Sequence, residues 1–225
     1  DVQAKLWELG VSMDCSHNEV APGQHEFCPI FSSTNTAADT NILAIEVMND
    51  MAKDHGLAIL LHEKPFKGIN GSGKHNNWGL NTDTGGNMFV PGSSSFEQTR
   101  FMGFVAALLR GVHLHGDLFR ACVSTCGNNH RLGAQEAPPA IFTLYLGKQL
   151  EGHLRDCAAG GAVDGYNANK QLIDMPGGVS TIKGGSEDRN RTAPIPWCGN
   201  RFEFRAVGSN QHIGLPNTVM NTVVA

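Results

Sequence analysis

Two carboxylates flank a tight turn near the start of the chain, in the segment EVAPGQHE. Pro22 and Gly23 predict a turn between two short strands, over residues 17–20 and 24–31, which places Glu19 and Glu26 near the strand ends that face the turn. Two converging carboxylates suit a hard cation such as Mg²⁺ or Mn²⁺, because these ions prefer oxygen ligands. Solvated carboxylates at strand ends are the alternative interpretation of the same pattern.

A glycine-rich stretch, NGSGKH, forms the second group of chemically useful residues. Gly71 and Gly73 allow the backbone to approach a ligand closely, and His75 follows on a predicted strand. The stretch is similar to a phosphate-binding loop but lacks the GxxxxGK[ST] spacing of a P-loop. An ordinary glycine-rich turn therefore stays open as an interpretation.

Arginines are concentrated near the C-terminal end, where four of the nine lie within 17 residues. On a strand, Arg201, Glu203 and Arg205 would share one face because the side-chain period is two. Such a face could neutralise carboxylate and phosphate oxygens through paired contacts. A solvated face with a local ion pair is the alternative. The four arginines are Arg189, Arg191, Arg201 and Arg205.

Regular elements must position these groups. Apolar periodicity and stop signals predict helices over residues 1–10, 37–55, 95–112 and 138–154, the last one following a polar loop that carries Arg131 and Glu136. Strands are expected at 57–61, where the apolar run indicates a buried one, and at 202–207. Residues 158–187 are rich in glycine and poor in large apolar side chains, which favours a surface excursion, and an apolar segment begins at 218.

Length and charge exclude several classes of protein. The 225 residues carry a formal net charge of −4, so no overall basic field favours nucleic acid or an anionic membrane. No apolar run approaches the length of a membrane-spanning helix. The six cysteines lack the spacing of a disulfide scaffold or a zinc ribbon, so we expect mostly reduced thiols and a cytoplasmic location.

Four segments in this order resemble the catalytic domain of glutamine synthetase, and their residue patterns are closest to those of the type III branch. They are HNEVAPGQHEF, LLHEKPFKGINGSGKHNNW, NHRLGAQEAPPAIF and DRNRTAPIPWCGNRFEFRAVGS. The resemblance implies an α+β fold with a curved, mainly antiparallel sheet backed by helices. It also implies ATP-dependent ligation of ammonia to the side-chain carboxylate of L-glutamate through γ-glutamyl phosphate, and self-association into a ring homo-oligomer.

The resemblance further implies roles for single residues. Glu19 and Glu26 would hold one divalent ion, Mg²⁺ or Mn²⁺, and His75 with Glu203 would hold a second ion against the ATP phosphates.

On the substrate side, Asn70 and Gly71 would bind the amino end of glutamate and Arg131 its carboxylate. Glu136 would accept a proton from ammonium. Side chains that would face the phosphoryl group, the nucleotide or the substrate carboxylate are Asn77, Arg191, Arg201 and Arg205.

The resemblance covers only part of such an enzyme. We expect residues 1–225 to be a catalytic-domain segment without the N-terminal β-grasp domain, a further acidic pair and the C-terminal region, and we expect the isolated segment to be inactive. A γ-glutamyl-amine ligase of the same superfamily and a non-catalytic structural relative remain alternatives.

Overall fold

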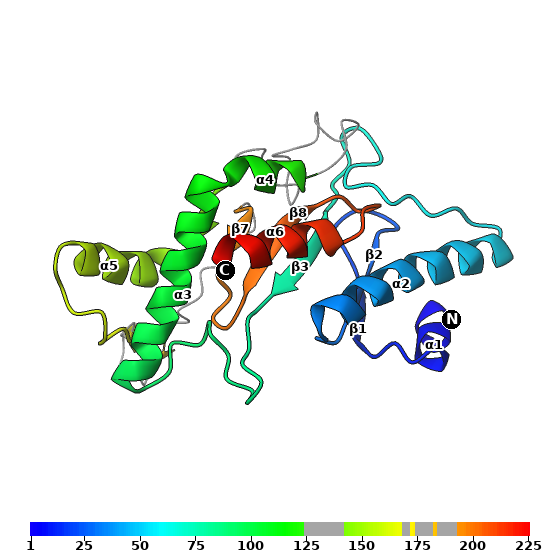
Figure 1. Ribbon diagram of the computed structural model, residues 1–225. Helices are drawn as coiled ribbons and strands as arrows, with labels where there is room; N and C mark the ends of the chain where they lie inside the picture. The colour runs from blue at the N-terminus through cyan, green and yellow to red at the C-terminus, as the bar shows by residue number, and fades with distance from the viewer. Residues whose placement is uncertain (124–141, 168–171, 174–181, 184–192) are drawn as a thin grey trace.

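The computed structural model describes residues 1–123, 142–167, 172–173, 182–183 and 193–225 (Figure 1). Helices alternate with short strands in an α+β arrangement, as expected. The strands form four two-stranded pairs, of which three are antiparallel and one is parallel. Within the described residues these pairs do not join into the single continuous sheet that the resemblance implied. None of the helices described is both long enough and apolar enough to span a membrane.

The N-terminal part is a hairpin packed on two helices. Helix α1 (Val2–Glu8) precedes strands β1 (Met13–Asn18) and β2 (His25–Pro29), which pair antiparallel, and helix α2 (Thr34–Asp54) follows. The predicted helices and the hairpin are therefore confirmed, although β1 begins and ends earlier than residues 17–20. A small apolar cluster joins these elements, and its fully or nearly buried members are Leu6, Val11, Met13, Ala44 and Val47.

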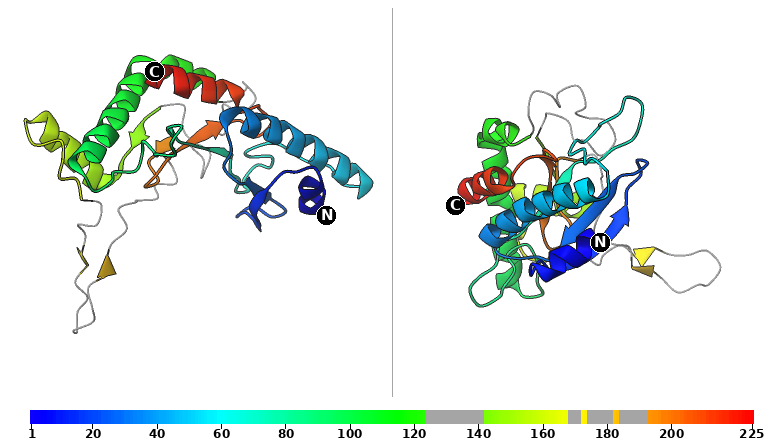
Figure 2. Two further views of the ribbon diagram at one scale, coloured as in Figure 1. Left: turned by 60° about the horizontal axis from the view of Figure 1, so that its bottom comes forward. Right: turned by 90° about the vertical axis from the view of Figure 1, so that its right-hand side faces the viewer.

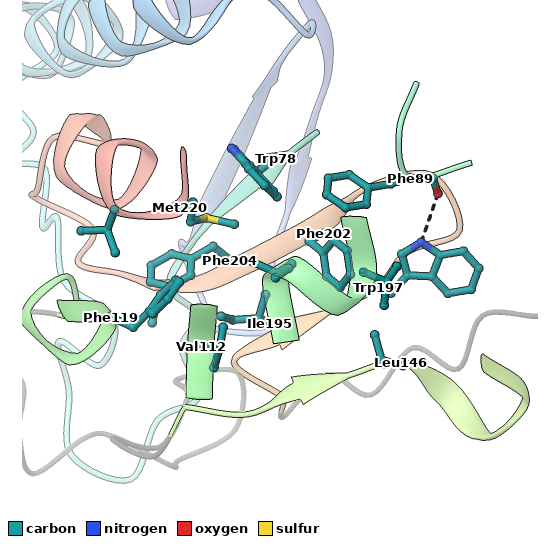
Figure 3. Packing of buried hydrophobic residues seen from close by; sticks show 14 of the residues in the cluster. Trp78, Phe89, Val112, Phe119, Leu146, Ile195, Trp197, Phe202, Phe204 and Met220 are labelled. Carbon is teal, nitrogen blue, oxygen red and sulfur yellow. Dashed lines mark hydrogen bonds between the residues drawn. The ribbon is translucent and has the colours of Figure 1, made fainter. Parts of the chain in front are cut away.

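A larger apolar core surrounds the antiparallel pair of β3 (Lys74–Trp78) and β8 (Phe202–Val207). Helices α3 (Ser95–Leu114), α4 (Gly116–Ala121) and α6 (Gly214–Val224) supply much of the packing. Phe202 and Phe204 are fully buried, and the Phe204 ring packs against Phe119 with the ring centres 6.1 Å apart, as can be followed in Figure 3. Phe202 and Phe204 thus lie on the core side of β8, which leaves Glu203 and Arg205 on the other side of the strand.

The remaining elements lie at the edge of this core. Strand β4 (Leu144–Tyr145) pairs in parallel with β7 (Ile195–Pro196), and helix α5 (Gly147–Ala158) follows β4. Strands β5 (Leu172–Ile173) and β6 (Ile182–Lys183) form a pair that projects away from the other strands in both views of Figure 2. This pair falls within the glycine-rich stretch 158–187.

Two of the predicted elements are wrong. Residues 57–61 form no strand, and Leu57 and Leu60 are largely exposed. The apolar run therefore does not mark a buried strand. Of the helix predicted over 138–154, residues 138–141 lie outside the described residues, and in the part that is described the helix begins at Gly147, because Leu144 and Tyr145 pair with a strand distant in sequence. Gly147 has a φ of 76°, which a continuous right-handed helix does not allow.

Candidate active site

The β1–β2 hairpin brings its acidic pair together with a histidine. His17 pairs with Glu26 across the strands, and the Glu19 amide donates to the Gln24 carbonyl at 3.0 Å to close the turn. His17 Nε2 lies 3.1 Å from Glu19 Oε1 and 2.8 Å from Glu26 Oε2. The ligand atoms of these three residues lie within 4.8 Å of one another. The convergence of the two carboxylates is therefore present, and His17 completes a set suited to a divalent cation.

Sequence reasoning missed His17, although a signal was available. His17 stands two residues before Glu19, so an extended backbone carries both side chains on one face. Burial acts to raise the pKa of Glu19, but hydrogen bonding with Glu26 and His17, and the charges of His17 and His75, together lower it. The carboxylate is thus held in its ionised, cation-binding form.

The second acid–histidine pair spans β3 and β8. His75 Nδ1 lies 3.6 Å from Glu203 Oε1, and both side chains are more than four-fifths buried. Gln24 in the hairpin turn donates to Ser72, three residues before His75, and the charge of His75 acts on Glu19, so the two groups are neighbours in space. Residues from two distant parts of the chain thus form adjoining groups of possible ligands.

Arg205 lies on the same face of β8 as Glu203. Its Nε and Nη2 atoms donate to Glu203 Oε2 at 2.9 and 2.7 Å, and the arginine is only 6% exposed. The predicted alternation holds from Phe202 to Arg205, with the two phenylalanines in the core and Glu203 and Arg205 opposite, whereas Val207 is also buried in the core. A buried guanidinium beside a carboxylate creates a fixed positive group next to the possible ligands.

Arg201 precedes β8 and links it to β3. Its Nε donates to Asn77 Oδ1 at 2.8 Å, and its Nη1 donates to Asn200 Oδ1 at 2.8 Å. The guanidinium also lies 6.0 Å from the centre of the Phe31 ring, within the range of a cation–π contact. Two of the predicted phosphate-side residues, Arg201 and Asn77, are thereby brought into direct contact.

The NGSG loop lies against the hairpin. Gln24 Nε2 donates to the Ser72 carbonyl at 3.4 Å and to its hydroxyl at 3.2 Å. A Cβ atom on Gly71 would lie 1.9 Å from the Glu63 carbonyl oxygen, so only glycine fits there. The close approach that the structure shows at Gly71 is thus to the protein's own backbone. Asn70 directly precedes this position and is half-buried.

Two charged residues that sequence reasoning did not single out support this loop. Glu63 is 6% exposed and accepts a hydrogen bond from the Ser209 amide. Lys74 donates to Asn41 Oδ1 at 3.2 Å and to the Gln211 carbonyl. Burial lowers the pKa of Lys74 to about 8, against the opposing influence of Glu63. Both residues lie within a segment that carries the family resemblance, but neither was given a role of its own.

Three predicted site residues cannot be placed. Arg131, Glu136 and Arg191 lie outside the described residues. The gathered residues comprise Glu19, Glu26, His75, Asn77, Arg201, Glu203 and Arg205, with Asn70 and Gly71 in the adjoining loop.

Comparison with known proteins shows to which family the chain belongs. The sequence profile described as "Glutamine synthetase, catalytic domain" matches residues 1–140. The chain belongs to the glutamine synthetase catalytic-domain family. The resemblance predicted from the four segments is confirmed. The type III branch is supported by "Type-3 glutamine synthetase" of Dictyostelium discoideum, which is 46% identical over 225 residues, all of this chain.

Other relatives agree with this assignment. A "Glutamine synthetase" of Bacteroides fragilis is 41% identical over 228 residues and also matches the whole chain. The chain spans only 30% of the Dictyostelium protein and 31% of the Bacteroides protein.

Solved structures show the same fold. A GmaS–ADP complex aligns with 99% of the chain and 45% of its own length, with a TM-score of 0.65 and 18% identity. Glutamine synthetase of Plasmodium falciparum aligns with 99% of the chain and 35% of its own length, with a TM-score of 0.64 and 16% identity.

Proposed function

We propose that this chain contributes the metal- and phosphate-binding part of an active site that ligates ammonia to the side-chain carboxylate of L-glutamate, consuming ATP and forming glutamine, ADP and phosphate. The observation that carries the proposal is the adjacency of the two acid–histidine groups, His17–Glu19–Glu26 and His75–Glu203. The family relationship supplies the reaction.

The donor atoms of both groups fit divalent cations. Carboxylate oxygens suit Mg²⁺ and Mn²⁺, and an imidazole shifts the preference toward Mn²⁺. Glu19 and Glu26 would hold one ion and His75 with Glu203 the other. Bound ions would supply charge neutralisation at the phosphate oxygens.

The arginines would act on the phosphoryl group. Arg205, fixed by Glu203, presents a positive charge that needs no reorganisation when negative charge develops on the transferring phosphoryl oxygens. Arg201 and Asn77, already in contact, would orient the nucleotide phosphates, and Arg191 would join them.

On the glutamate side, Asn70 and Gly71 would bind the amino end of the substrate and Arg131 its carboxylate. Glu136 would take the proton that ammonium must lose before nitrogen can attack the acyl phosphate. Exclusion of water around these groups would protect that intermediate from hydrolysis.

Location and assembly extend the proposal. Cys15, Cys28, Cys122 and Cys157 are free thiols, which supports the cytoplasm as the location. Exposed apolar side chains at Leu57, Leu60 and Phe66 support self-association into a ring, because such side chains are covered at subunit interfaces. Light scattering of the intact protein would test this, and a monomer at micromolar concentration would refute it.

The cation-binding role can be tested by calorimetry with Mn²⁺ on the intact protein. Glu26→Gln removes one charged ligand, so we expect Mn²⁺ affinity to fall by about 10-fold or more, together with ATP-dependent formation of γ-glutamyl hydroxamate. The control is Glu151→Gln, which alters an exposed pair with Arg155 on α5. Equal Mn²⁺ affinity in both variants would refute the role of Glu26.

The same hydroxamate assay tests the expectation for the 225 residues alone. The segment should show no ATP- and Mg²⁺-dependent product, because the resemblance places further metal ligands outside it. Robust turnover by the segment would contradict that expectation. In the intact protein, competition between ammonium and small amines would separate glutamine synthesis from γ-glutamyl-amine ligation. Preferred use of an amine would contradict the assignment of ammonia as the substrate.

A further inference from the structure

One face of the β1–β2 hairpin carries a second set of ligating side chains beside the acidic pair. Cys15 stands opposite Cys28 in the strand register, and His17 stands opposite Glu26, two residues along each strand. Because side chains two apart share a face, both pairs lie on the same side of the ribbon. The other side packs on the helices through Phe27, which contacts the small apolar cluster.

An irregularity in β1 makes this arrangement possible. The register shifts between Met13 and Cys15, as at a β-bulge. Met13 is buried in the small cluster, whereas Cys15 is exposed, although an unbroken strand would place both on one face. The shift therefore turns Cys15 away from the core and toward His17 and Cys28.

The ligand atoms are already close to a coordinating geometry. Both cysteine sulfurs and one His17 ring nitrogen lie within 4.8 Å of one another. In a tetrahedral zinc site with Zn–S and Zn–N bonds of about 2.3 and 2.0 Å, neighbouring ligand atoms lie roughly 3.3–3.8 Å apart. Cys15 and His17 are exposed and Cys28 is half-buried, so small side-chain rotations suffice to close the difference.

We propose that Cys15, His17 and Cys28 form a binding site for a thiophilic cation, with Zn²⁺ as the ion that suits two sulfurs and one imidazole, and with solvent completing the coordination. The site is chemically distinct from the adjacent carboxylates, because sulfur ligands select soft ions and oxygen ligands select hard ones. One hairpin thus presents two sites of opposite preference.

His17 connects the two sites. Its Nε2 atom contacts both Glu19 and Glu26, at 3.1 and 2.8 Å. A cation bound through His17 would add positive charge next to the two carboxylates. It would also hold in place the His17 imidazole, which now contacts both Glu19 and Glu26. This second step rests on the proposed function, since it assumes that Glu19 and Glu26 bind Mn²⁺. We expect Zn²⁺ to weaken Mn²⁺ binding by about 5-fold or more.

Cobalt substitution tests the site directly. The intact protein, kept reduced with a phosphine, is titrated with Co²⁺, and thiolate coordination is read from sulfur-to-cobalt charge-transfer absorption in the near ultraviolet. We expect the band in the wild type, its loss in Cys15→Ser and in Cys28→Ser, and its displacement by Zn²⁺. The matched control is Cys157→Ser, which changes a half-buried thiol on α5.

Three outcomes of the cobalt titration would overturn the proposal. Absence of the band in the wild type, or its persistence in both Cys15→Ser and Cys28→Ser, would overturn the proposal, as would its loss in the control. Far-ultraviolet circular dichroism of each variant confirms that loss of the band is not loss of fold. Mn²⁺ calorimetry with and without Zn²⁺ then tests the coupling. Failure of Mn²⁺ to bind at all would sink the proposed function while leaving the cobalt result intact.

Discussion

Gly71 offers the sharpest test of how the loop beside the site is built. In Gly71→Ala the new Cβ would lie 1.9 Å from the Glu63 carbonyl oxygen, more than an ångström inside the closest approach that Cβ atoms tolerate. The obstacle is backbone, so no side-chain rotation relieves it, and either the NGSG loop or the segment at Glu63 must move. Overpacking of this kind costs about 1–3 kcal/mol.

That cost is measurable. In a protein of this size, 1 kcal/mol shifts Tm by about 2–4 °C, so a cost near 3 kcal/mol should lower the melting temperature of the variant by about 6–12 °C in calorimetry. Gly103→Ala is the matched control, because Gly103 lies in α3 with no atom near a Cβ, and alanine there favours the helix by up to about 1 kcal/mol. If both variants melt at or above the wild-type temperature, the close contact at Gly71 does not exist.

Three further predictions concern the stability of the fold. Asn76→Ala should cost about 1–3 kcal/mol in urea unfolding, because the buried Asn217 amide loses its partner at 2.8 Å; a change below about 0.5 kcal/mol would contradict this. Ser94→Ala should cost about 1 kcal/mol by removing the capping box of α3, whereas Ser95→Ala, one residue along, should be nearly neutral in the same urea titration. Burial raises the pKa of Tyr166 to about 12, so the unfolded state loses its phenolic proton first and stability falls between about pH 10 and pH 12. Tyr166→Phe should flatten that fall and cost nothing at neutral pH, since the phenolic oxygen has no hydrogen-bond partner in the described part of the chain; an equally steep decline in the variant would refute the assignment.

Periodicity predicted the elements whose burial follows from their own sequence. The helix at Thr34–Asp54 and the strand at Phe202–Val207 each carry apolar residues at the period of their own secondary structure, so a local pattern is enough to locate them. Prediction failed where a distant partner decides the outcome. Residues 144–145 form a strand only because Ile195 and Pro196 lie beside them, and nothing near residue 144 encodes that pairing.

The site residues divide in the same way, into those that a local pattern predicts and those that depend on distant partners. Glu203 and Arg205 could be placed on one face of a strand because both belong to a single alternating segment. Glu63 could not be identified, because its importance arises from tertiary contacts, with Gly71 in the neighbouring loop and with Ser209, which lies 146 residues away in sequence. Local patterns therefore find residues that act from one element, and they miss those that hold two elements together.

His17 shows how a small irregularity decides the chemistry of the whole hairpin. The register that sets His17 opposite Glu26 also sets Cys15 opposite Cys28, and a slip by one residue would move all of these side chains to the other face. The register shift after Met13 lets the strand bury an apolar residue at its start while keeping the ligating residues outward. Neither composition nor the Pro22–Gly23 turn predicts that shift. The carboxylate pair could therefore be proposed from the turn alone, whereas the histidine and the sulfurs beside it become visible only once the register is known.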